Sequence, residues 1–141
     1  MRKEYLSYTK QLLVDQGYTC VLYDGKNIVA STKRGVAPLL ELLENKSSFE
    51  DFVAADKVVG RATAFLYVLL NVKYVYANVI SKGAMDVFVK HKVQFSYNEM
   101  VEEIKNREGT GCCPMEEVTK GVEDANAALN AIKQRYMELS R

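Results

Sequence analysis

The sequence contains one histidine, three cysteines and almost no net charge, and each shortage excludes a class of protein. A single histidine, His91, excludes a metal site built from several imidazoles, and we interpret it as a solvated turn residue. The cysteines Cys20, Cys112 and Cys113 lack the even spacing of a disulfide framework, and adjacent cysteines seldom bond to each other. We therefore expect a protein of the reducing cytoplasm.

The charge balance argues against binding to nucleic acid. Lys and Arg together number 19 and Asp and Glu 18, which leaves a formal net charge of +1 with no basic stripe. The longest apolar run, around residues 62–70, is far shorter than the roughly 20 residues that cross a bilayer. The first residues are charged and precede no apolar stretch, so we expect neither a secretory signal nor a membrane partner.

Length and composition are those of one globular unit. The chain has 141 residues, of which 48% are hydrophobic and 26% charged, enough to bury a proper core. It contains no internal repeat, low-complexity tract or linker-like segment. The prediction is a single domain over residues 1–141.

The first third predicts a helix, a hairpin and a second helix. Apolar residues recur at helical spacing over residues 2–16, and Gly17 follows as a helix-ending glycine. Two segments rich in β-forming residues, 18–23 and 27–32, flank Asp24-Gly25, which is a strong hairpin signal. A second helix is expected over residues 36–44, with Pro38 in its first turn.

Residues 57–70 are apolar on nearly every face, which predicts a helix buried on most sides. Asp56 would then be the N-cap of this helix, accepting hydrogen bonds from its free amides. Gly60 would lie inside it and permit close packing against a neighbouring helix.

The second half predicts alternating strands and helices: a strand over 73–80, a helix over 82–90, a strand over 93–97, a helix over 98–105, a glycine-bearing loop over 106–114 and a C-terminal helix. A strand–helix–strand unit requires a right-handed crossover and hence a parallel pair of strands. Together with the hairpin, this predicts an α/β fold, a three-layer α-β-α sandwich with a mixed sheet.

Two segments resemble those of a known family. Residues 56–62 (Asp-Lys-Val-Val-Gly-Arg-Ala) and 106–116 (Asn-Arg-Glu-Gly-Thr-Gly-Cys-Cys-Pro-Met-Glu) are similar to segments of a small, functionally uncharacterised prokaryotic family. The resemblance covers roughly residues 18–129. It implies a cytidine-deaminase-like fold, which also begins with a helix and an antiparallel hairpin, and it implies no established activity.

The zinc deaminases of that fold hold their metal with an H-x-E motif and a P-C-x-x-C motif at two helix starts. The corresponding positions are expected at residues 56–58 and 81–84, which contain no histidine or cysteine. Cys112-Cys113-Pro114 lacks a second cysteine at the required spacing and follows one strand too late. We expect no metal, no cofactor and no zinc-dependent deamination.

Asp56 is the first candidate site residue. One interpretation is a helix cap that contributes about 1 kcal/mol. The other is a carboxylate that binds a ligand hydroxyl, removes a proton or attacks an electrophilic carbon. Lys57 and Arg61 are expected to face solvent, with a ligand phosphate as the alternative partner.

The second candidate region is the loop before the last helices. Glycines around Thr110 expose backbone amides, and Pro114 and Glu116 suit a helix start, so the loop either holds an anion or forms a tight turn with a cap. Cys113 stands directly before this helix, where the terminus could lower the pKa of its thiol, but no histidine partner is evident.

Three hypotheses of function follow. The first is a binding protein for a nucleotide- or nucleoside-like small molecule, whose expected contacts are Asp56, Lys57, Gly60, Ser81, Lys82, Thr110, Gly111 and Cys112. The second is a metal-independent enzyme with Asp56 as base or nucleophile, assisted by Glu116 or Cys113. The third is a scaffold that lost its site, and the apolar helices and tyrosines favour a homodimer.

Overall fold

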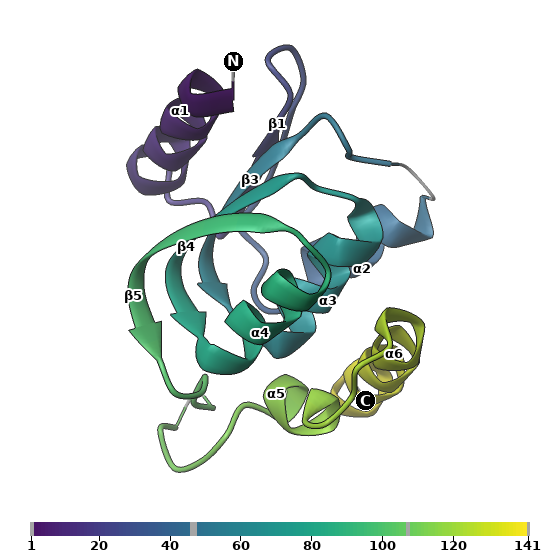
Figure 1. The fold of residues 1–141 in the computed structure, drawn as a ribbon. Helices are drawn as coiled ribbons and strands as arrows, with labels where there is room; N and C mark the ends of the chain where they lie inside the picture. Colours follow the sequence, from purple (N-terminus) through teal and green to yellow (C-terminus); the bar gives the residue numbers. More distant parts are fainter. Residues whose placement is uncertain (1, 46–47, 107, 141) are drawn as a thin grey trace.

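A computed structural model describes residues 2–45, 48–106 and 108–140 (Figure 1). In chain order the elements are α1 (Arg2–Asp15), β1 (Cys20–Tyr23), β2 (Ile28–Ser31), α2 (Ala37–Glu44), β3 (Val53–Val59), α3 (Arg61–Leu70), β4 (Tyr74–Ser81), α4 (Lys82–Lys90), β5 (Gln94–Val101), α5 (Pro114–Thr119) and α6 (Ala125–Leu139). None of the helices within these ranges is long and apolar enough to cross a membrane.

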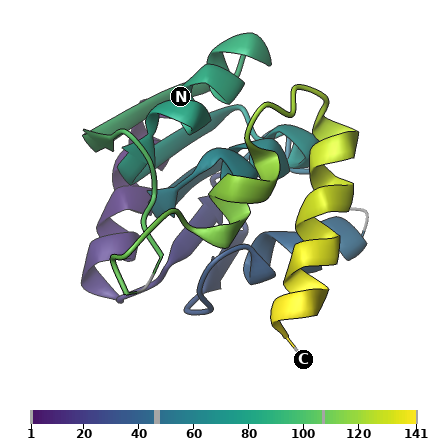
Figure 2. The same ribbon diagram turned by 90° about the horizontal axis from the view of Figure 1, so that it is seen from below.

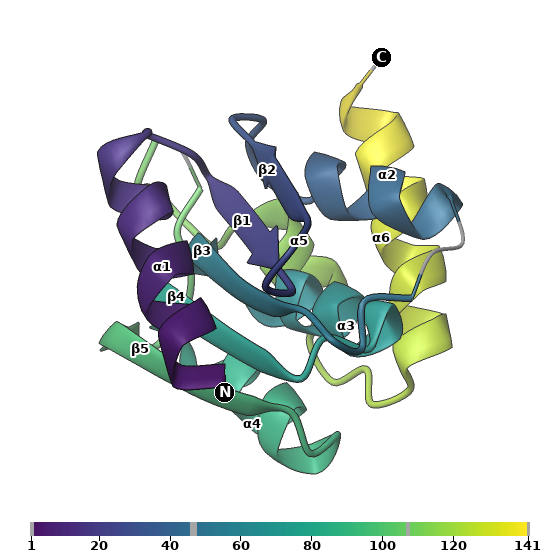
Figure 3. The ribbon, with the colours of Figure 1, turned by 90° about the horizontal axis from the view of Figure 1, so that it is seen from above.

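The strands form one mixed sheet in the order β2-β1-β3-β4-β5. Strand β1 pairs antiparallel with both β2 and β3, whereas β3, β4 and β5 are parallel to one another. Helix α1 covers one face of the sheet, over β1 and β3, and α2, α3 and α4 lie on the other face (Figure 3). The expected α/β class with a mixed sheet and helices on both faces is confirmed.

The predicted hairpin is also confirmed. Asp24 closes its turn, since its Oδ1 accepts hydrogen bonds from the backbone N–H groups of Lys26 at 2.8 Å and Asn27 at 2.6 Å. Gly25 has φ of +98°, a conformation that other L residues rarely adopt. The Asp-Gly pair therefore identified the hairpin through the backbone conformation that the turn requires.

The helix predicted over residues 57–70 is wrong in its first part. Residues Val53–Val59 form β3, the central strand, and the helix begins only at Arg61. The strand is covered on both faces, so it has the nearly continuous apolar character of a buried helix, and periodicity alone cannot separate the two. Asp56 is consequently a strand residue and not a helix N-cap.

The helix predicted over residues 98–105 is wrong as well. Strand β5 continues to Val101 and pairs with β4 along its whole length, from Tyr74↔Gln94 to Ser81↔Val101. The segment is polar and rich in glutamate because β5 is an edge strand with much of its surface exposed. Pairing with β4 outweighs the local helix propensity of these residues.

The C-terminal residues form a pair of helices beside α3. Helix α6 lies against both α3 and α5, and the three helices are seen together from below in Figure 2. Asp124 caps α6, because its Oδ2 accepts a hydrogen bond from the Ala127 N–H at 2.9 Å. This pair places α5 next to the first turn of α3, where the candidate site lies.

Candidate functional site

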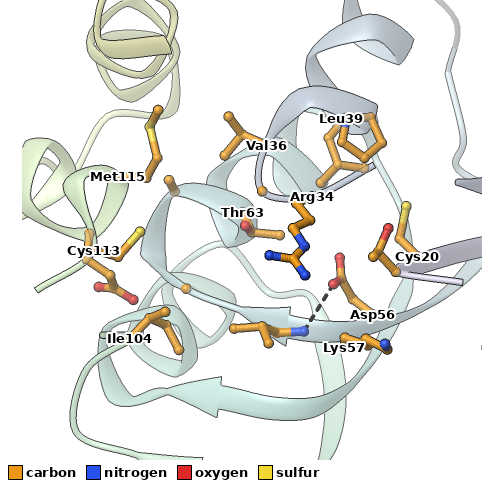
Figure 4. A pocket seen from close by; sticks show the side chains of 17 residues that line it. Cys20, Arg34, Val36, Leu39, Asp56, Lys57, Thr63, Ile104, Cys113 and Met115 are labelled. Atoms are coloured by element: carbon orange, nitrogen blue, oxygen red, sulfur yellow. Dashed lines mark hydrogen bonds between the residues drawn. The ribbon is translucent and has the colours of Figure 1, made fainter. Parts of the chain in front are cut away.

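A cavity of about 430 Å³ lies at the carboxyl end of β3, where the chain turns into α3. Its walls come from the start of β1, the connection from β2 to α2, the end of β3, the first turn of α3 and the start of α5 (Figure 4). Most of the lining is apolar. The polar side chains in the lining include Thr19, Arg34, Asp56, Lys57, Thr63 and Glu116. The volume is in the range of small-molecule pockets, about 300–1,000 Å³.

Asp56 lies in this lining with only 8% of its surface exposed. Its Oδ2 accepts a hydrogen bond from the Tyr67 hydroxyl at 2.6 Å, and its Oδ1 accepts one from the Val58 N–H at 3.2 Å. Burial raises the pKa of Asp56 to about 7, and hydrogen bonding by Tyr67 and by the backbone of Val58 and Lys57 reduces that rise. Near neutral pH the cavity therefore contains both the acid and the carboxylate.

Two buried titratable groups lie close to the Asp56 carboxyl, and one of them, Cys20, also lines the cavity. Tyr67 is fully buried on α3, and Cys20 is the direct partner of Asp56 in the register of β1 and β3. Burial, reinforced by the negative charge of Asp56, raises the pKa of both the Tyr67 hydroxyl and the Cys20 thiol. Tyr67 thus stays a hydrogen-bond donor and fixes the orientation of Asp56.

Glu116 reaches the cavity from α5 and caps α3. Its side chain is 6% exposed, and its Oε1 accepts a hydrogen bond from the Arg61 N–H at 3.0 Å. Gly60 is the N-cap residue of α3, so the expectation that it lies inside a helix is wrong. A Cβ at Gly60 would come within 2.6 Å of Glu116 Oε1 and 3.1 Å of Ile104 Cγ1, so the close approach of Glu116 depends on this glycine.

We expect Gly60→Ala to lower the free energy of unfolding by about 1–3 kcal/mol, because the methyl group displaces the Glu116 carboxylate from the Arg61 N–H. Gly83→Ala is the matched control, since its Cβ would meet Arg61 side-chain carbons at 3.5–3.8 Å, an ordinary contact. Urea unfolding of both variants measures the difference. A loss at Gly83 as large as that at Gly60, or a cost at Gly60 that persists undiminished in Glu116→Ala, would contradict the displacement.

Arg61 does not face solvent, contrary to expectation. It is 9% exposed, and its guanidinium donates hydrogen bonds to the carbonyl oxygens of Thr119 at 2.7 Å, Gly83 at 3.3 Å and Val122. It also lies 3.6 Å from a carboxylate oxygen of Glu123. Arg61 therefore joins α3 to the start of α4 and to the segment between α5 and α6. Its guanidinium group has a structural role.

Some of the site residues predicted from the sequence line this cavity. Five of the predicted site residues line it: Asp56, Lys57, Gly60, Cys113 and Glu116. Lys57 is exposed, as expected, and Cys113 occupies the N-cap position of α5 with its N–H donated to the Ile104 carbonyl at 2.8 Å. Residues from two distant segments, the end of β3 and the start of α5, thus share one cavity.

The remaining predicted ligand contacts lie outside its lining: Ser81, Lys82, Thr110, Gly111 and Cys112. Ser81 caps α4, since its Oγ accepts a hydrogen bond from the Ala84 N–H at 3.1 Å, and Lys82 is exposed. In the loop, the Thr110 N–H donates to Asn106 Oδ1 at 3.0 Å, so this amide is used within the loop itself. Burial, with the nearby Glu103 charge, raises the pKa of the Cys112 thiol.

The sequence pattern of a domain of unknown function, DUF1893 (TM1506), matches residues 8–136. The chain belongs to the DUF1893 family. A crystal structure of a DUF1893 family protein, TM1506 from Thermotoga maritima, superimposes with a TM-score of 0.90 and 24% sequence identity, covering 96% of this chain and 92% of that one. No curated protein matches the chain. The resemblance to an uncharacterised family is confirmed, and the structural likeness shows the fold alone.

Several residues of the DUF1893 cavity were not predicted as site residues from the sequence, among them the polar residues Thr63 and Arg34. Thr63, in the first turn of α3, is 9% exposed, and its hydroxyl has no hydrogen-bond partner in the part of the chain that the structure describes. Arg34 lies between β2 and α2, and its exposed side chain lines the cavity (Figure 4). Neither residue belongs to a motif, and only the folded topology brings them to Asp56.

The helix starts of this DUF1893 chain offer few metal ligands. The turn into α3 is Gly60-Arg61-Ala62, so the expected correspondence of residues 56–58 to a helix start is wrong, and the turn into α4 begins at Ser81. Across residues 2–45, 48–106 and 108–140, no three His, Cys, Asp or Glu side chains gather closely enough to hold a metal ion. The chemistry available in the cavity is that of carboxyl, hydroxyl, thiol and guanidinium groups.

Proposed function

We propose that this DUF1893 protein binds a nucleoside- or nucleotide-like small molecule in the cavity beside Asp56. The observation that carries the proposal is the buried Asp56 carboxyl in the lining of a largely apolar cavity of about 430 Å³. Among the residues that the structure describes, Asp56 pairs with no cation, and a buried carboxyl of this kind in a cavity is a typical candidate for a functional site. Tyr67 holds the carboxyl in one orientation, which favours recognition of a specific ligand edge.

The walls suit a planar ring. Val36, Leu39, Ile104 and Met115 contribute apolar surface to the same cavity lining as Asp56. Ligand pockets combine such walls with a few polar groups that fix orientation. A heteroaromatic base satisfies both requirements, because its faces are apolar and its edge carries hydrogen-bonding groups.

The exposed cations of the cavity suit a ligand with an anionic group. Arg34 and Lys57 are both exposed and both line the cavity. Guanidinium groups bind phosphate with two parallel hydrogen bonds, and ammonium groups bind it as a point charge. A ligand whose ring enters the cavity could therefore place a phosphate beside Arg34 at the solvent side.

We further propose that the fold is cytidine-deaminase-like. The support is the order of elements, in which a helix and an antiparallel hairpin precede parallel strand–helix–strand units. In such open sheets ligands bind outside the carboxyl ends of the strands, and the cavity lies at that end of β3. The residues at the two helix starts favour binding, or chemistry without zinc, over deamination.

Thermal denaturation with a panel of nucleobases, nucleosides and nucleotides tests the proposal. We expect at least one member to raise the Tm of the wild-type protein, as any ligand that binds only the folded state does. Asp56→Ala should abolish that rise, whereas Lys82→Ala, an exposed change outside the cavity, should preserve it. The proposal fails if no member raises the Tm, and the scaffold hypothesis is then favoured.

An enzyme remains the second candidate, because the cavity brings together the three residues proposed for chemistry, Asp56, Cys113 and Glu116. The intact mass of the protein after incubation with each panel member distinguishes the two. A covalent adduct that disappears in Asp56→Ala or Cys113→Ala favours catalysis. A stabilising ligand that leaves the protein mass and its own mass unchanged favours binding.

A further inference from the structure

We infer that the ligand presents N–H donors to the interior of the cavity, as an amino- or amidine-bearing ring does, and directs any anionic group toward Arg34. This inference rests on the proposed binding function and specifies the class of ligand. It follows from which polar atoms of the cavity lining already have hydrogen-bond partners among the described residues and which do not.

The first observation is that the N-terminus of α3 is already occupied by a carboxylate. A helix N-terminus is the usual place for a ligand anion in an α/β protein. Here the Glu116 carboxylate occupies that place, and its Oε1 accepts a hydrogen bond from the Arg61 N–H. An anionic ligand group at this end would meet the negative charge of Glu116, with the carboxyl of Asp56 in the same lining.

The second observation is the surplus of acceptor atoms in the interior. Oε1 of Glu116 binds the Arg61 N–H, but its Oε2 has no hydrogen-bond donor among the residues that the structure describes, although the side chain is only 6% exposed. An ionised carboxyl group can only accept hydrogen bonds, and this oxygen is not among the fully buried unpartnered atoms of the described residues, so it is accessible from the cavity that Glu116 lines. A ligand N–H is the complementary group.

The third observation is independent of the carboxyl groups. The Thr63 hydroxyl is 9% exposed, has no partner in the described part of the chain, and is drawn in the middle of the cavity lining in Figure 4. A hydroxyl can accept an N–H bond or donate to a ring nitrogen. The neighbouring cation, Arg34, is exposed, so the positive charge lies toward solvent and the acceptors lie inside.

Three small probes of one shape test the inference. Benzamidine carries a cationic pair of N–H groups, benzamide is neutral, and benzoate is anionic. We expect the wild-type protein to bind benzamidine roughly tenfold or more tightly than benzoate, with benzamide between them, as measured by titration calorimetry or by ligand-detected NMR.

Glu116→Gln supplies the decisive variant. Its amide oxygen can still accept the Arg61 N–H, so the cap is retained, while its amide nitrogen turns a donor toward the cavity. We expect the preference for benzamidine over benzoate to fall by roughly tenfold or to reverse. Glu117→Gln is the matched control, because it removes the same charge from the neighbouring exposed position on α5 and does not line the cavity.

Several results would overturn the inference. They are equal or tighter binding of benzoate by the wild-type protein, an equal effect of Glu117→Gln, or no binding of any probe. Failure here differs from failure of the proposed function. A nucleoside from the panel that binds in an Asp56-dependent manner through a ring without N–H donors retains the proposed function and refutes the donor-bearing class.

Discussion

Asp56→Asn should become more stable than the wild-type protein as the pH rises, with a change in relative unfolding free energy on the order of 4 kcal/mol between pH 4 and pH 8. The cause is the pKa of Asp56, which burial raises from 3.8 to about 7. Between these two values the folded protein keeps a proton that the unfolded chain releases. The stability contributed by this proton is present at low pH and is lost as the pH rises toward 7.

The direction of this pH dependence of stability is opposite to that of most acidic residues, and it distinguishes Asp56 from them. Each pH unit between the two pKa values lowers the wild-type stability by about 1.4 kcal/mol through this group. Hydrogen bonds lower the pKa values of Asp24 and Glu123. The contribution of these two groups to folding stability is therefore lost as the pH falls. Comparing variant and wild-type protein at each pH cancels those shared contributions.

The surroundings of Asp56 allow the asparagine to fit. The amide oxygen can accept the Val58 N–H, and the amide nitrogen can donate to the Tyr67 hydroxyl oxygen in place of the present bond. The other titratable and charged groups in its surroundings or in the cavity lining are Cys20 on β1, Tyr67 on α3, Arg34 and Lys57 at the exposed side and Glu116 on α5. The raised pKa values of Cys20 and Tyr67 keep both neutral up to pH 8.

Urea unfolding followed by circular dichroism at intervals from pH 4 to pH 8 measures the effect. Asp86→Asn, an exposed carboxylate on α4, controls for the loss of one negative charge. A difference between Asp56→Asn and wild type that is flat across this range would show that Asp56 is ionised in the folded protein near pH 4. In that case the cavity would contain a permanent carboxylate.

The parts of the fold that the sequence predicts are those with local signals. The Asp24-Gly25 turn, the polar–apolar alternation at the start of β5 and the helix over Lys82–Lys90 each depend on neighbours in the chain. Strand β3 has no such signal, because it is buried on both faces and continues directly into an equally apolar helix. Its identity is fixed by pairing with β1 and β4, which a single sequence does not display.

The candidate site could likewise be predicted only in part: single residues could be chosen from local segments, but their proximity could not. Asp56 and Glu116 were selected from separate segments, and they share a cavity because the end of β3 and the start of α5 both adjoin the first turn of α3. Ser81 was selected on the assumption that all helix starts at this edge form one site. The Arg61 side chain lies at the start of α4, where it donates a hydrogen bond to the Gly83 carbonyl, and Ser81 does not line the cavity.

Arg61→Met should lower the free energy of unfolding by about 3–5 kcal/mol, because it removes three hydrogen bonds from a charged donor, each contributing roughly 1.5 kcal/mol. Methionine retains much of the aliphatic volume, so the loss isolates the guanidinium. The carbonyl oxygens of Gly83, Thr119 and Val122 each lose a charged donor, although the Thr119 carbonyl still accepts from the Val122 N–H. Urea unfolding gives the magnitude, and Arg135→Met on α6 is the control, since that arginine is more exposed and pairs with the exposed Glu138.

Arg61→Met should also destabilise the cavity wall, because Arg61 attaches the end of α5 and the segment before α6 to the rest of the fold. Helix α5 carries Met115 and Glu116 into the cavity wall. We expect amide hydrogen exchange in Arg61→Met to accelerate over residues 114–139 more than in the sheet, and ligand affinity to fall with it. A destabilisation below about 1 kcal/mol, or exchange that accelerates equally everywhere, would mean that the helix pair is held by its apolar contacts with α3 and not by this arginine.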